Sequence, residues 1–540
     1  MKKIALIYIC ITCFISMGNA TDTLTLIPHP HQVLTKEGNY QLNKTVKVAV
    51  SPVFIKEGED LKKILSTEFG LQTRDVKATK ADIYLNYDPT FTPEQKEAYQ
   101  LEVTDKGVII CARTQVGVFY GIQSLRQLLK KVNGKYELTQ QVITDYPAYP
   151  WRSFMLDEGR YFKGEKVVKD ILDEMARLKM NIFHWHLTDD QGWRIEIKKY
   201  PLLTQIGAFR DSTQVEWYES QRYDGKPHGG FYTQKQIRDI VAYAAERHIT
   251  IIPEIEMPGH SAAAIAAYPW LSTTGKEIKV PCYFGVQYDV FNVADPRVLA
   301  FLDEVIDETI ALFPSGILHI GGDEVRYDQW NGSPSVRQFM RERELSSTSD
   351  LQVWFTNRMS KSISQKGYRM MGWNDITGEK LHHFQTSDTN GKAFLTPGNI
   401  VQFWAGDVSM MQRAAQQGQS IVNSYNDFTY LNYSYEYDSL QATYDFKPVS
   451  LKRAYEFRPV PEDFPVQLTA RILGGGCQMW GEWIPTVESM NYLIYPRIAA
   501  YAEVLWTKPD KKDYPRFRKS LDYFLTYWKN KGIAYGPTGD

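Results

Sequence analysis

From residue 151 onward, short apolar runs alternate with segments whose apolar residues recur at helical spacing. In residues 164–180, Val168, Ile171 and Met175 lie on one helical stripe, and residues 233–248 and 296–313 repeat the pattern. The apolar runs each end in polar or aromatic residues and cover 152–160, 180–190, 249–260, 316–324, 369–375, 400–406, 420–425 and 471–482. Eight strands alternating with helices predict an α/β fold, a parallel (β/α)8 barrel, with functional residues at the C-terminal ends of its strands.

The first part of the chain has a different pattern. Residues 45–50 and 81–87 are typical of strands, residues 99–113 of a hairpin turning at 105–107, and residues 116–132 of an amphipathic helix. The segment 145–151 carries two prolines. We therefore predict a small α/β domain over 21–147 and the barrel over 148–540, with a closing helix at 516–532.

The first 20 residues are typical of a secretory signal. Lys2 and Lys3 precede an apolar run, and small residues follow at 18–20. The alternative is a retained membrane anchor, but the apolar run is shorter than the ~20 residues that a spanning helix needs. We expect export to the periplasm or cell surface of a bacterium, and no membrane insertion after cleavage.

Composition narrows the classes of function. Lys and Arg number 62 against 63 Asp and Glu, which gives no basic footprint for nucleic acid or an anionic membrane. Only Cys111, Cys282 and Cys477 follow the signal, too few for a disulfide framework. Aromatic residues make up 13% of the chain. They suit either a large core or sugar stacking, and Trp373, Trp404 and Trp480, all at predicted strand ends, favour a sugar pocket.

Two adjacent carboxylates, Asp323 and Glu324, end the fourth predicted barrel strand. Neighbouring residues of a strand point to opposite faces, but Gly321 and Gly322 permit the chain to turn there. Both side chains can then face the mouth of the barrel. The alternative is a pair of loop carboxylates that caps the next helix. Like-charge repulsion favours a protonated acid in such a pair, as cleavage of a glycosidic bond requires.

The segment 184–190 contains His184, His186, Asp189 and Asp190. Such a cluster can bind a metal, but two histidines on one strand face are more often hydrogen-bonded residues inside a barrel. We expect no metal and no cofactor. His260 ends the strand that follows Asp189, so an Asp189–His260 pair is geometrically reasonable.

Several blocks resemble glycoside hydrolase family 20, the β-N-acetylhexosaminidases. "HIGGDE" at 319–324 matches the family's H-x-G-G-D-E signature, and other blocks match in the same order over most of the chain: "LDEGRYF", "HWHLTDDQGW", "PEIEMPGHSAA", "GWND", "QFWAG" and "MWGEW". The resemblance implies exo-acting hydrolysis of terminal β-linked GlcNAc or GalNAc, with retention of configuration and glycans as partners. The nucleophile would be the substrate's own 2-acetamido oxygen, which closes to an oxazolinium ion.

The resemblance also implies roles for individual residues. Glu324 would be the general acid and base, and Asp323 would orient the acetamido group. Asp189 and His260 would support Glu324, and Tyr430 would hydrogen-bond the acetamido carbonyl. The substrate-binding residues implied are Arg160, Trp373, Trp404, Trp480 and Glu482, together with position 432.

Position 432 departs from the family pattern, which has Asp where this chain has Asn432. An amide removes a charge that repels a sulfate and adds N–H donors, so we hypothesise tolerance of 6-O-sulfated GlcNAc. The alternative is a local shift of alignment, with Asp427 or Asp438 serving instead.

Two other functions remain open at this stage. A non-catalytic carbohydrate-binding protein would retain the Trp walls and lose the acid. A retaining glycosidase with a separate carboxylate nucleophile would cleave substrates that lack the 2-acetamido group. The aglycone and the oligomeric state are not determined by these patterns.

Overall fold

The computed structural model describes residues 24–385, 393–436 and 446–539. The predicted signal peptide at 1–20 and Asp438 lie outside the described residues. Among the described helices, none combines the length and the apolar character that a membrane span requires. Cys111, Cys282 and Cys477 are free thiols.

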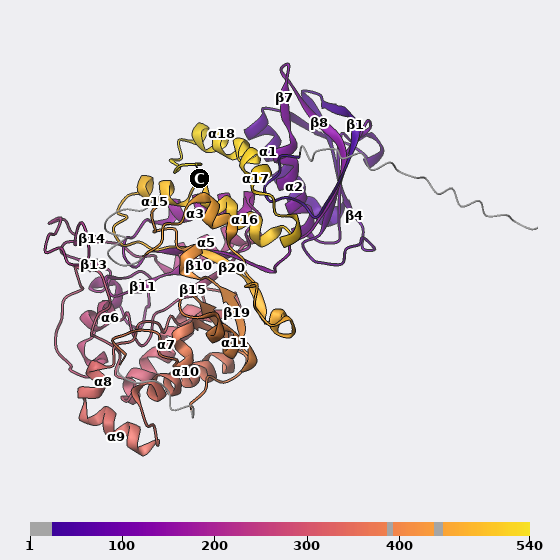
Figure 1. The fold of residues 1–540 in the computed structure, drawn as a ribbon. Helices are drawn as coiled ribbons and strands as arrows, with labels where there is room; N and C mark the ends of the chain where they lie inside the picture. The colour runs from indigo at the N-terminus through magenta and orange to yellow at the C-terminus, as the bar shows by residue number, and fades with distance from the viewer. Residues whose placement is uncertain (1–23, 386–392, 437–445, 540) are drawn as a thin grey trace, which may run out of the picture.

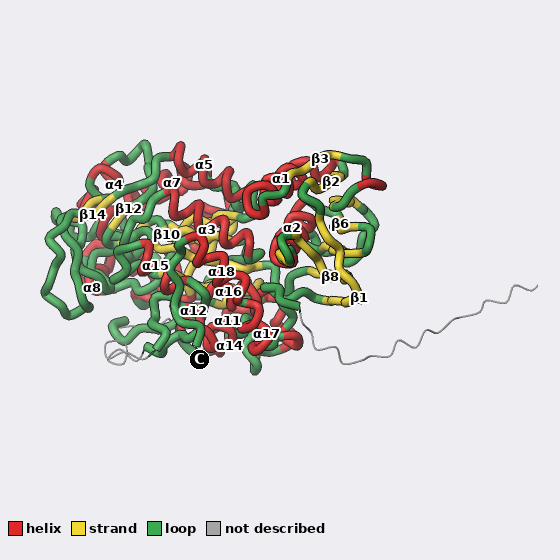
Figure 2. The backbone as a smooth tube through the Cα atoms, turned by 90° about the horizontal axis from the view of Figure 1, so that it is seen from above, coloured by secondary structure: helices red, strands yellow, loops and turns green. Residues whose placement is uncertain are grey.

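Residues 24–145 form an α/β domain beside the barrel (Figure 1). Its sheet has the order β1-β8-β5-β6-β4-β2-β3, with β7 paired to β8. The helices α1 (Ile55–Phe69) and α2 (Gln115–Leu128) lie on the face of the sheet toward the barrel (Figure 2). The strands are β1 (Gln32–Leu42), β2 (Thr45–Val50), β3 (Gln72–Asp75), β4 (Ile83–Tyr87), β5 (Tyr99–Thr104), β6 (Gly107–Ala112), β7 (Lys130–Val132) and β8 (Lys135–Asp145).

Two expected helices differ from their predictions. The helix predicted over 116–132 ends at Leu128, because Lys130–Val132 turns back at Asn133–Gly134 and pairs with β8. Both turn residues have positive φ, as a tight hairpin requires. The closing helix is two helices, α17 (Tyr514–Ser520) and α18 (Asp522–Lys531). Ser520 Oγ donates to the carbonyl oxygen of Arg516 at 2.9 Å, a bond that bends helices.

The eight predicted barrel strands are all present, and they close into a parallel barrel in chain order, with β20 pairing back to β9. They are β9 (Trp151–Asp157), β10 (Ile182–His186), β15 (Thr250–Glu254), β16 (Ile317–His319), β17 (Arg369–Trp373), β18 (Ile400–Phe403), β19 (Ser420–Asn423) and β20 (Ile472–Met479). The prediction of a (β/α)8 barrel preceded by a small α/β domain is confirmed.

Helices surround the strands (Figure 2). They include α3 (Glu165–Arg177), α5 (Gln234–Ala245), α7 (Pro296–Ile310), α10 (Thr348–Gln365), α11 (Val408–Gln416) and α16 (Arg497–Trp506). Between β17 and β18 the described residues form only a 3-10 turn, Asn374–Thr377. That turn lies directly beside the functional site.

Asp145 joins the two parts of the molecule. Its buried carboxylate lies 2.9 Å from the Lys179 ammonium nitrogen of the barrel and accepts a hydrogen bond from Trp506 Nε1 at 2.9 Å. Because a buried carboxylate is costly without partners, these contacts fix the end of β8 against the barrel.

Candidate active site

The residues singled out from the sequence all lie at one end of the barrel. Each of them ends or closely follows a strand, and the C-terminal ends of parallel strands share one end of a barrel. They are Arg160 (after β9), Asp189 (in the short strand β11, Thr188–Asp189, which follows β10), His260 (after β15), Asp323 and Glu324 (after β16), Trp373 (the last residue of β17), Trp404 (after β18), Tyr430 and Asn432 (after β19), and Trp480 and Glu482 (after β20).

A sharp turn brings Asp323 and Glu324 to one place. Strand β16 stops at His319, and Gly321, Gly322 and Glu324 have φ values of 62°, 88° and 52°. A Cβ atom at Gly321 would lie 1.8 Å from Glu256 Oε2, so only glycine fits there. As a result, one atom, His260 Nε2, lies 3.7 Å from Asp323 Oδ2 and 3.4 Å from Glu324 Oε2.

Asp323 is a buried acid with one free oxygen. Its side chain is almost fully enclosed, and Asp323 Oδ1 has no hydrogen-bond partner among the described residues. Burial raises the pKa of Asp323 to about 7 against the attraction of His260, and the neighbouring Asp375 and Glu324 act in the same direction as burial. The free oxygen can accept a hydrogen bond from a ligand N–H group.

Arg160, Asp189 and His260 form an ionic network beside this turn. Arg160 Nη2 lies 3.0 Å from Asp189 Oδ2 and 3.5 Å from Glu482 Oε1. His260 Nδ1 lies 3.4 Å from Asp189 Oδ1 and 3.1 Å from Asp190 Oδ2. Burial opposes a charged imidazole, but Asp189 and Asp190 hold the pKa of His260 well above its usual range. His260 therefore presents a cationic N–H to the two adjacent carboxylates.

Four aromatic rings gather around the same space. The rings of Trp373 and Trp480 are 5.6 Å apart, and Tyr430 lies 5.9 Å from Trp480. Trp404 stacks on Tyr430 at 6.1 Å with 9° between the planes. Such apolar walls suit the faces of a pyranose and a small methyl group.

Asp375 belongs to the site although no role was predicted for it. Its Oδ2 accepts from Trp404 Nε1 at 2.9 Å, and its Oδ1 accepts from the Glu324 backbone N–H at 3.2 Å and lies 2.7 Å from His382 Nε2. Burial acts against its charge, but the His382 cation and these hydrogen bonds hold the pKa of Asp375 below its usual range. The signal was an acid two residues after Trp373, in the quoted block "GWND".

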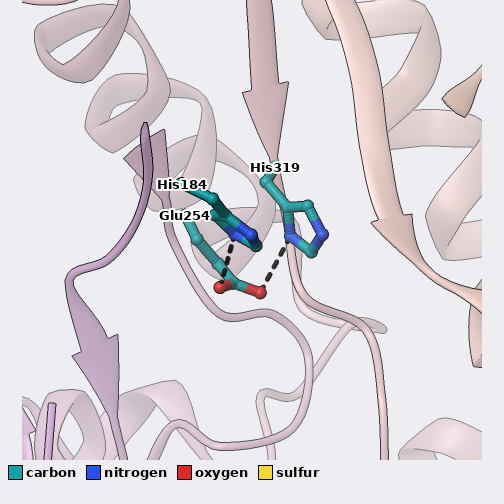
Figure 3. Close-up of side chains that lie close together, drawn as sticks. All are labelled: His184, Glu254 and His319. Atoms are coloured by element: carbon teal, nitrogen blue, oxygen red, sulfur yellow. Dashed lines mark ion pairs between the residues drawn. The ribbon is translucent and has the colours of Figure 1, made fainter. Parts of the chain in front are cut away.

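Glu254, the last residue of β15, was also missed; Figure 3 shows its carboxylate beside the rings of His184 and His319. Its Oε1 accepts from Trp373 Nε1 at 2.8 Å and lies 2.8 Å from His319 Nδ1. Its Oε2 lies 2.9 Å from His184 Nε2 and 2.5 Å from His186 Nδ1. A carboxylate inside the apolar run 249–255 was the available signal, since a buried acid requires partners.

His184 and His319 make short contacts with Glu254. Among the described residues, His184, Glu254 and His319 are one of four groups whose potential ligand atoms lie within 4.8 Å of one another. Their nitrogen–oxygen distances are 2.8 and 2.9 Å. Atoms that share a tetrahedral zinc ion with bonds of about 2.0–2.2 Å lie more than about 3 Å apart. The expectation that no metal is required stays a prediction.

Asn432 follows the strand β19, two residues after Tyr430. Its amide oxygen is buried and has no hydrogen-bond partner within the described part of the chain. Asp427 is engaged elsewhere, because its Oδ2 lies 2.7 Å from Lys447 Nζ and 3.4 Å from Arg453 Nη2. Asp427 is one of the two acids considered as substitutes for Asn432, and its carboxylate is held by two cations.

Two family models match the two parts of this chain. Residues 149–509 match a family model described as "Glycosyl hydrolase family 20, catalytic domain", and residues 23–146 match "Glycosyl hydrolase family 20, domain 2". A β-hexosaminidase of Porphyromonas gingivalis is 34% identical over 97% of this chain and 67% of its own length. One of Vibrio furnissii is 36% identical over 89% of this chain and 77% of its own.

A solved structure agrees with these matches. The GH20 exo-β-N-acetylglucosaminidase of Vibrio harveyi, in complex with N-acetylglucosamine, superposes with a TM-score of 0.81 at 30% identity. The alignment covers 96% of this chain and 79% of the Vibrio harveyi chain. The chain therefore belongs to glycosyl hydrolase family 20 and is a glycoside hydrolase of the β-N-acetylhexosaminidase type.

Proposed function

We propose that this enzyme is an exo-acting, retaining β-N-acetylhexosaminidase that removes terminal β-linked GlcNAc or GalNAc from glycans by substrate-assisted catalysis. One observation carries the proposal: Asp323 and Glu324 both approach His260 Nε2. A retaining enzyme with its own nucleophile needs its carboxylates on opposite sides of the glycosidic bond. Two carboxylates that approach one nitrogen from the same turn are suited to one acid and one orienting group.

In the first step, Glu324 gives its proton to the glycosidic oxygen as the bond from C1 to that oxygen breaks. The acetamido carbonyl oxygen forms the new bond to C1, and an oxazolinium ion results. Asp323 accepts the hydrogen bond of the acetamido N–H and balances the positive charge that develops there. Because the nucleophile is tethered to the sugar, its attack has the proximity advantage of an intramolecular reaction.

In the second step, Glu324 takes a proton from a water molecule, and the water oxygen attacks C1 and opens the oxazolinium ring. Two displacements restore the β configuration. His260 donates toward Glu324 and steadies its charge between the steps. Arg160 and Glu482 are assigned to the sugar hydroxyls, Tyr430 to the acetamido carbonyl, and Trp373, Trp404 and Trp480 to the walls.

Two assays separate this proposal from its rivals. The first compares aryl β-glycosides with and without the 2-acetamido group; we expect turnover only with it. The second measures inhibition by a thiazoline analogue of the cyclised intermediate, which should bind the wild type tightly and Asp323→Ala weakly. Cleavage of the substrate without the group would favour a separate nucleophile, and sugar binding without any turnover would indicate a carbohydrate-binding protein.

We also propose that the enzyme tolerates 6-O-sulfated GlcNAc. The amide side chain of Asn432 supports this idea, since an amide does not repel a sulfate as a carboxylate does. The test compares kcat/KM for sulfated and unsulfated aryl-GlcNAc in the wild type and in Asn432→Asp, with Asp427→Asn as the control. Asn432→Asp should lower the ratio of sulfated to unsulfated substrate. An unchanged ratio would contradict the proposal.

Export to the periplasm or cell surface is a further proposal, supported by the composition of residues 1–20. Expression of the full chain in a bacterium should yield a mature protein that begins near residue 21 and lies outside the cytoplasm. N-terminal sequencing of the fractionated protein tests this. A chain that retains Met1 in the cytoplasm would contradict it.

A further inference from the structure

A row of ionisable residues crosses the inside of the barrel below the reactive carboxylates. Asp157, His186, Glu254 and His319 lie opposite one another in register on the adjacent strands β9, β10, β15 and β16. All four side chains are fully buried. Charged groups without water must satisfy one another. The contacts that they make therefore determine which of them can carry charge.

His186 joins two parts of the site through its two ring nitrogens. Nδ1 lies 2.5 Å from Glu254 Oε2, and Nε2 lies 2.9 Å from Asp189 Oδ2. Glu254 holds the indole N–H of Trp373, and Asp189 contacts Arg160.

The contacts continue from Asp189 to the acid. Asp189 Oδ1 lies 3.4 Å from His260 Nδ1, and His260 Nε2 lies 3.4 Å from Glu324 Oε2. The path from Trp373 to Glu324 is therefore continuous, and His186 is its central link.

The imidazole of His186 must carry a proton on each nitrogen, since each faces a carboxylate. Burial opposes the charge, but Glu254 and Asp189 raise the pKa of His186 to about 10. The other ionisable groups that face it are Glu256, 3.9 Å from Nδ1, together with Asp157 on β9 and His184 on β10. A ring that stays protonated at neutral pH does not shuttle protons, so its contribution is a fixed geometry and a fixed charge.

We propose that His186 is a positioning residue for hydrolysis: its imidazole ties Glu254 to Asp189, so that the Trp373 wall and the His260–Glu324 pair keep one relative position. The inference rests on the proposed function. Without the His186 imidazole, Asp189 keeps its contact with Arg160 but loses the contact between its Oδ2 atom and His186 Nε2. Glu254 loses its shortest contact, which joins its Oε2 atom to His186 Nδ1. A misplacement of about 1 Å of the groups around a reacting centre can cost about 10²-fold in rate.

His184 provides a matched control. It lies two residues earlier on β10, is equally buried, and approaches the same oxygen, Glu254 Oε2, at 2.9 Å. No contact between His184 and Asp189 is observed among the described residues. Burial also lowers the pKa of His184 to about 4, so this ring is neutral where His186 is charged. A general role in packing the barrel would make the two histidines equivalent, whereas a positioning role would not.

The experiment compares His186→Gln and His184→Gln on an aryl β-GlcNAc substrate. His186→Gln should lower kcat by about 10- to 100-fold with little change in KM. It should also change the kcat–pH profile, because it removes a positive charge from the network that reaches Glu324 through Asp189 and His260. His184→Gln should keep the wild-type kcat–pH profile, even if it lowers the melting temperature as much as His186→Gln does.

Other outcomes overturn the inference. Equal losses in both variants, or a His186→Gln profile identical to that of the wild type, would assign His186 a structural role only. If His186→Gln does not fold, Glu254→Gln is measured in its place, and an unchanged pH profile there overturns the link. A wild type inactive on aryl N-acetylhexosaminides overturns the proposed function and this inference with it; an active wild type with equivalent histidines overturns the inference alone.

Discussion

The indole N–H of Trp404 donates a hydrogen bond to the buried carboxylate of Asp375 at 2.9 Å. The other oxygen of the same carboxylate accepts from the backbone N–H of Glu324, a residue whose φ of 52° is unfavourable for a side-chain-bearing residue. Asp375 therefore fixes both a wall of the site and the backbone of Glu324, the proposed general acid.

Replacement of Asp375 should disturb both the Trp404 wall and the backbone of Glu324. Asp375→Ala leaves the Trp404 and Glu324 N–H groups without an acceptor, and each such loss costs about 1–3 kcal/mol when buried. We expect kcat/KM to fall by about 10- to 100-fold. Asp239→Ala, which removes an exposed acid paired with Lys235, is the control. Equal activity in the two variants would contradict the role of Asp375.

The effect of removing the Glu324 carboxyl group should depend on the leaving group of the substrate. Glu324→Gln should lower kcat on a disaccharide by about 10²–10⁴-fold, the usual contribution of general acid catalysis. An aryl leaving group of low basicity needs little protonation, so kcat on an aryl substrate should fall by a smaller factor. Steady-state kinetics with both substrates check this, and losses of equal size would contradict the assignment of Glu324.

Stability should depend on pH through Asp323. Burial raises the pKa of this carboxyl from 3.8 to about 7, so the folded state binds the proton more tightly than the unfolded state. The resulting stabilisation is complete below about pH 4 and is lost as the pH rises through about 7. Asp323→Asn has no carboxyl group to ionise at this position, so it does not lose stability in this way as the pH rises. Its melting temperature should exceed that of the wild type by a few degrees at about pH 8 and match it at about pH 4. A difference that does not change with pH would contradict the prediction.

The turn before the carboxylates should not tolerate a side chain. Gly321→Ala places a Cβ atom against the Glu256 carboxylate and at a φ of 62°. We expect a lower melting temperature and a loss of activity. Gly332→Ala is the matched control, since nothing lies within 4 Å of a Cβ atom there and the residue ends a helix. Similar behaviour of the two variants would contradict this account of the turn.

Removal of divalent metal should leave the activity intact. Glu254 Oε2 lies 2.9 Å from His184 Nε2 and Glu254 Oε1 lies 2.8 Å from His319 Nδ1, closer than two ligand atoms of a tetrahedral zinc ion. The measurement is hydrolysis after prolonged chelation and buffer exchange. Activity that disappears and returns with Zn²⁺ would instead establish a metal site in this cluster.

The sequence by itself determined the barrel and the place of its site. Eight apolar runs that alternate with amphipathic segments can bury their surfaces in few ways, and a parallel barrel is one of them. The positions of Asp323, Glu324 and Trp373 at strand ends followed from the same periodicity. Gly321 and Gly322 already indicated a turn, because their freedom at positive φ is a local property.

Only the tertiary structure decided which ionisable groups contact one another. Glu254 lies 65 positions before His319 in the chain, yet strand register places them opposite each other. The same holds for Asp375 and Glu324, which meet because β16 and β17 are neighbours. The end of α2 was decided by pairing of Lys130–Val132 with β8. Local pattern predicts elements through their own periodicity, whereas the protonation of His186 depends on carboxylates that other strands bring to it.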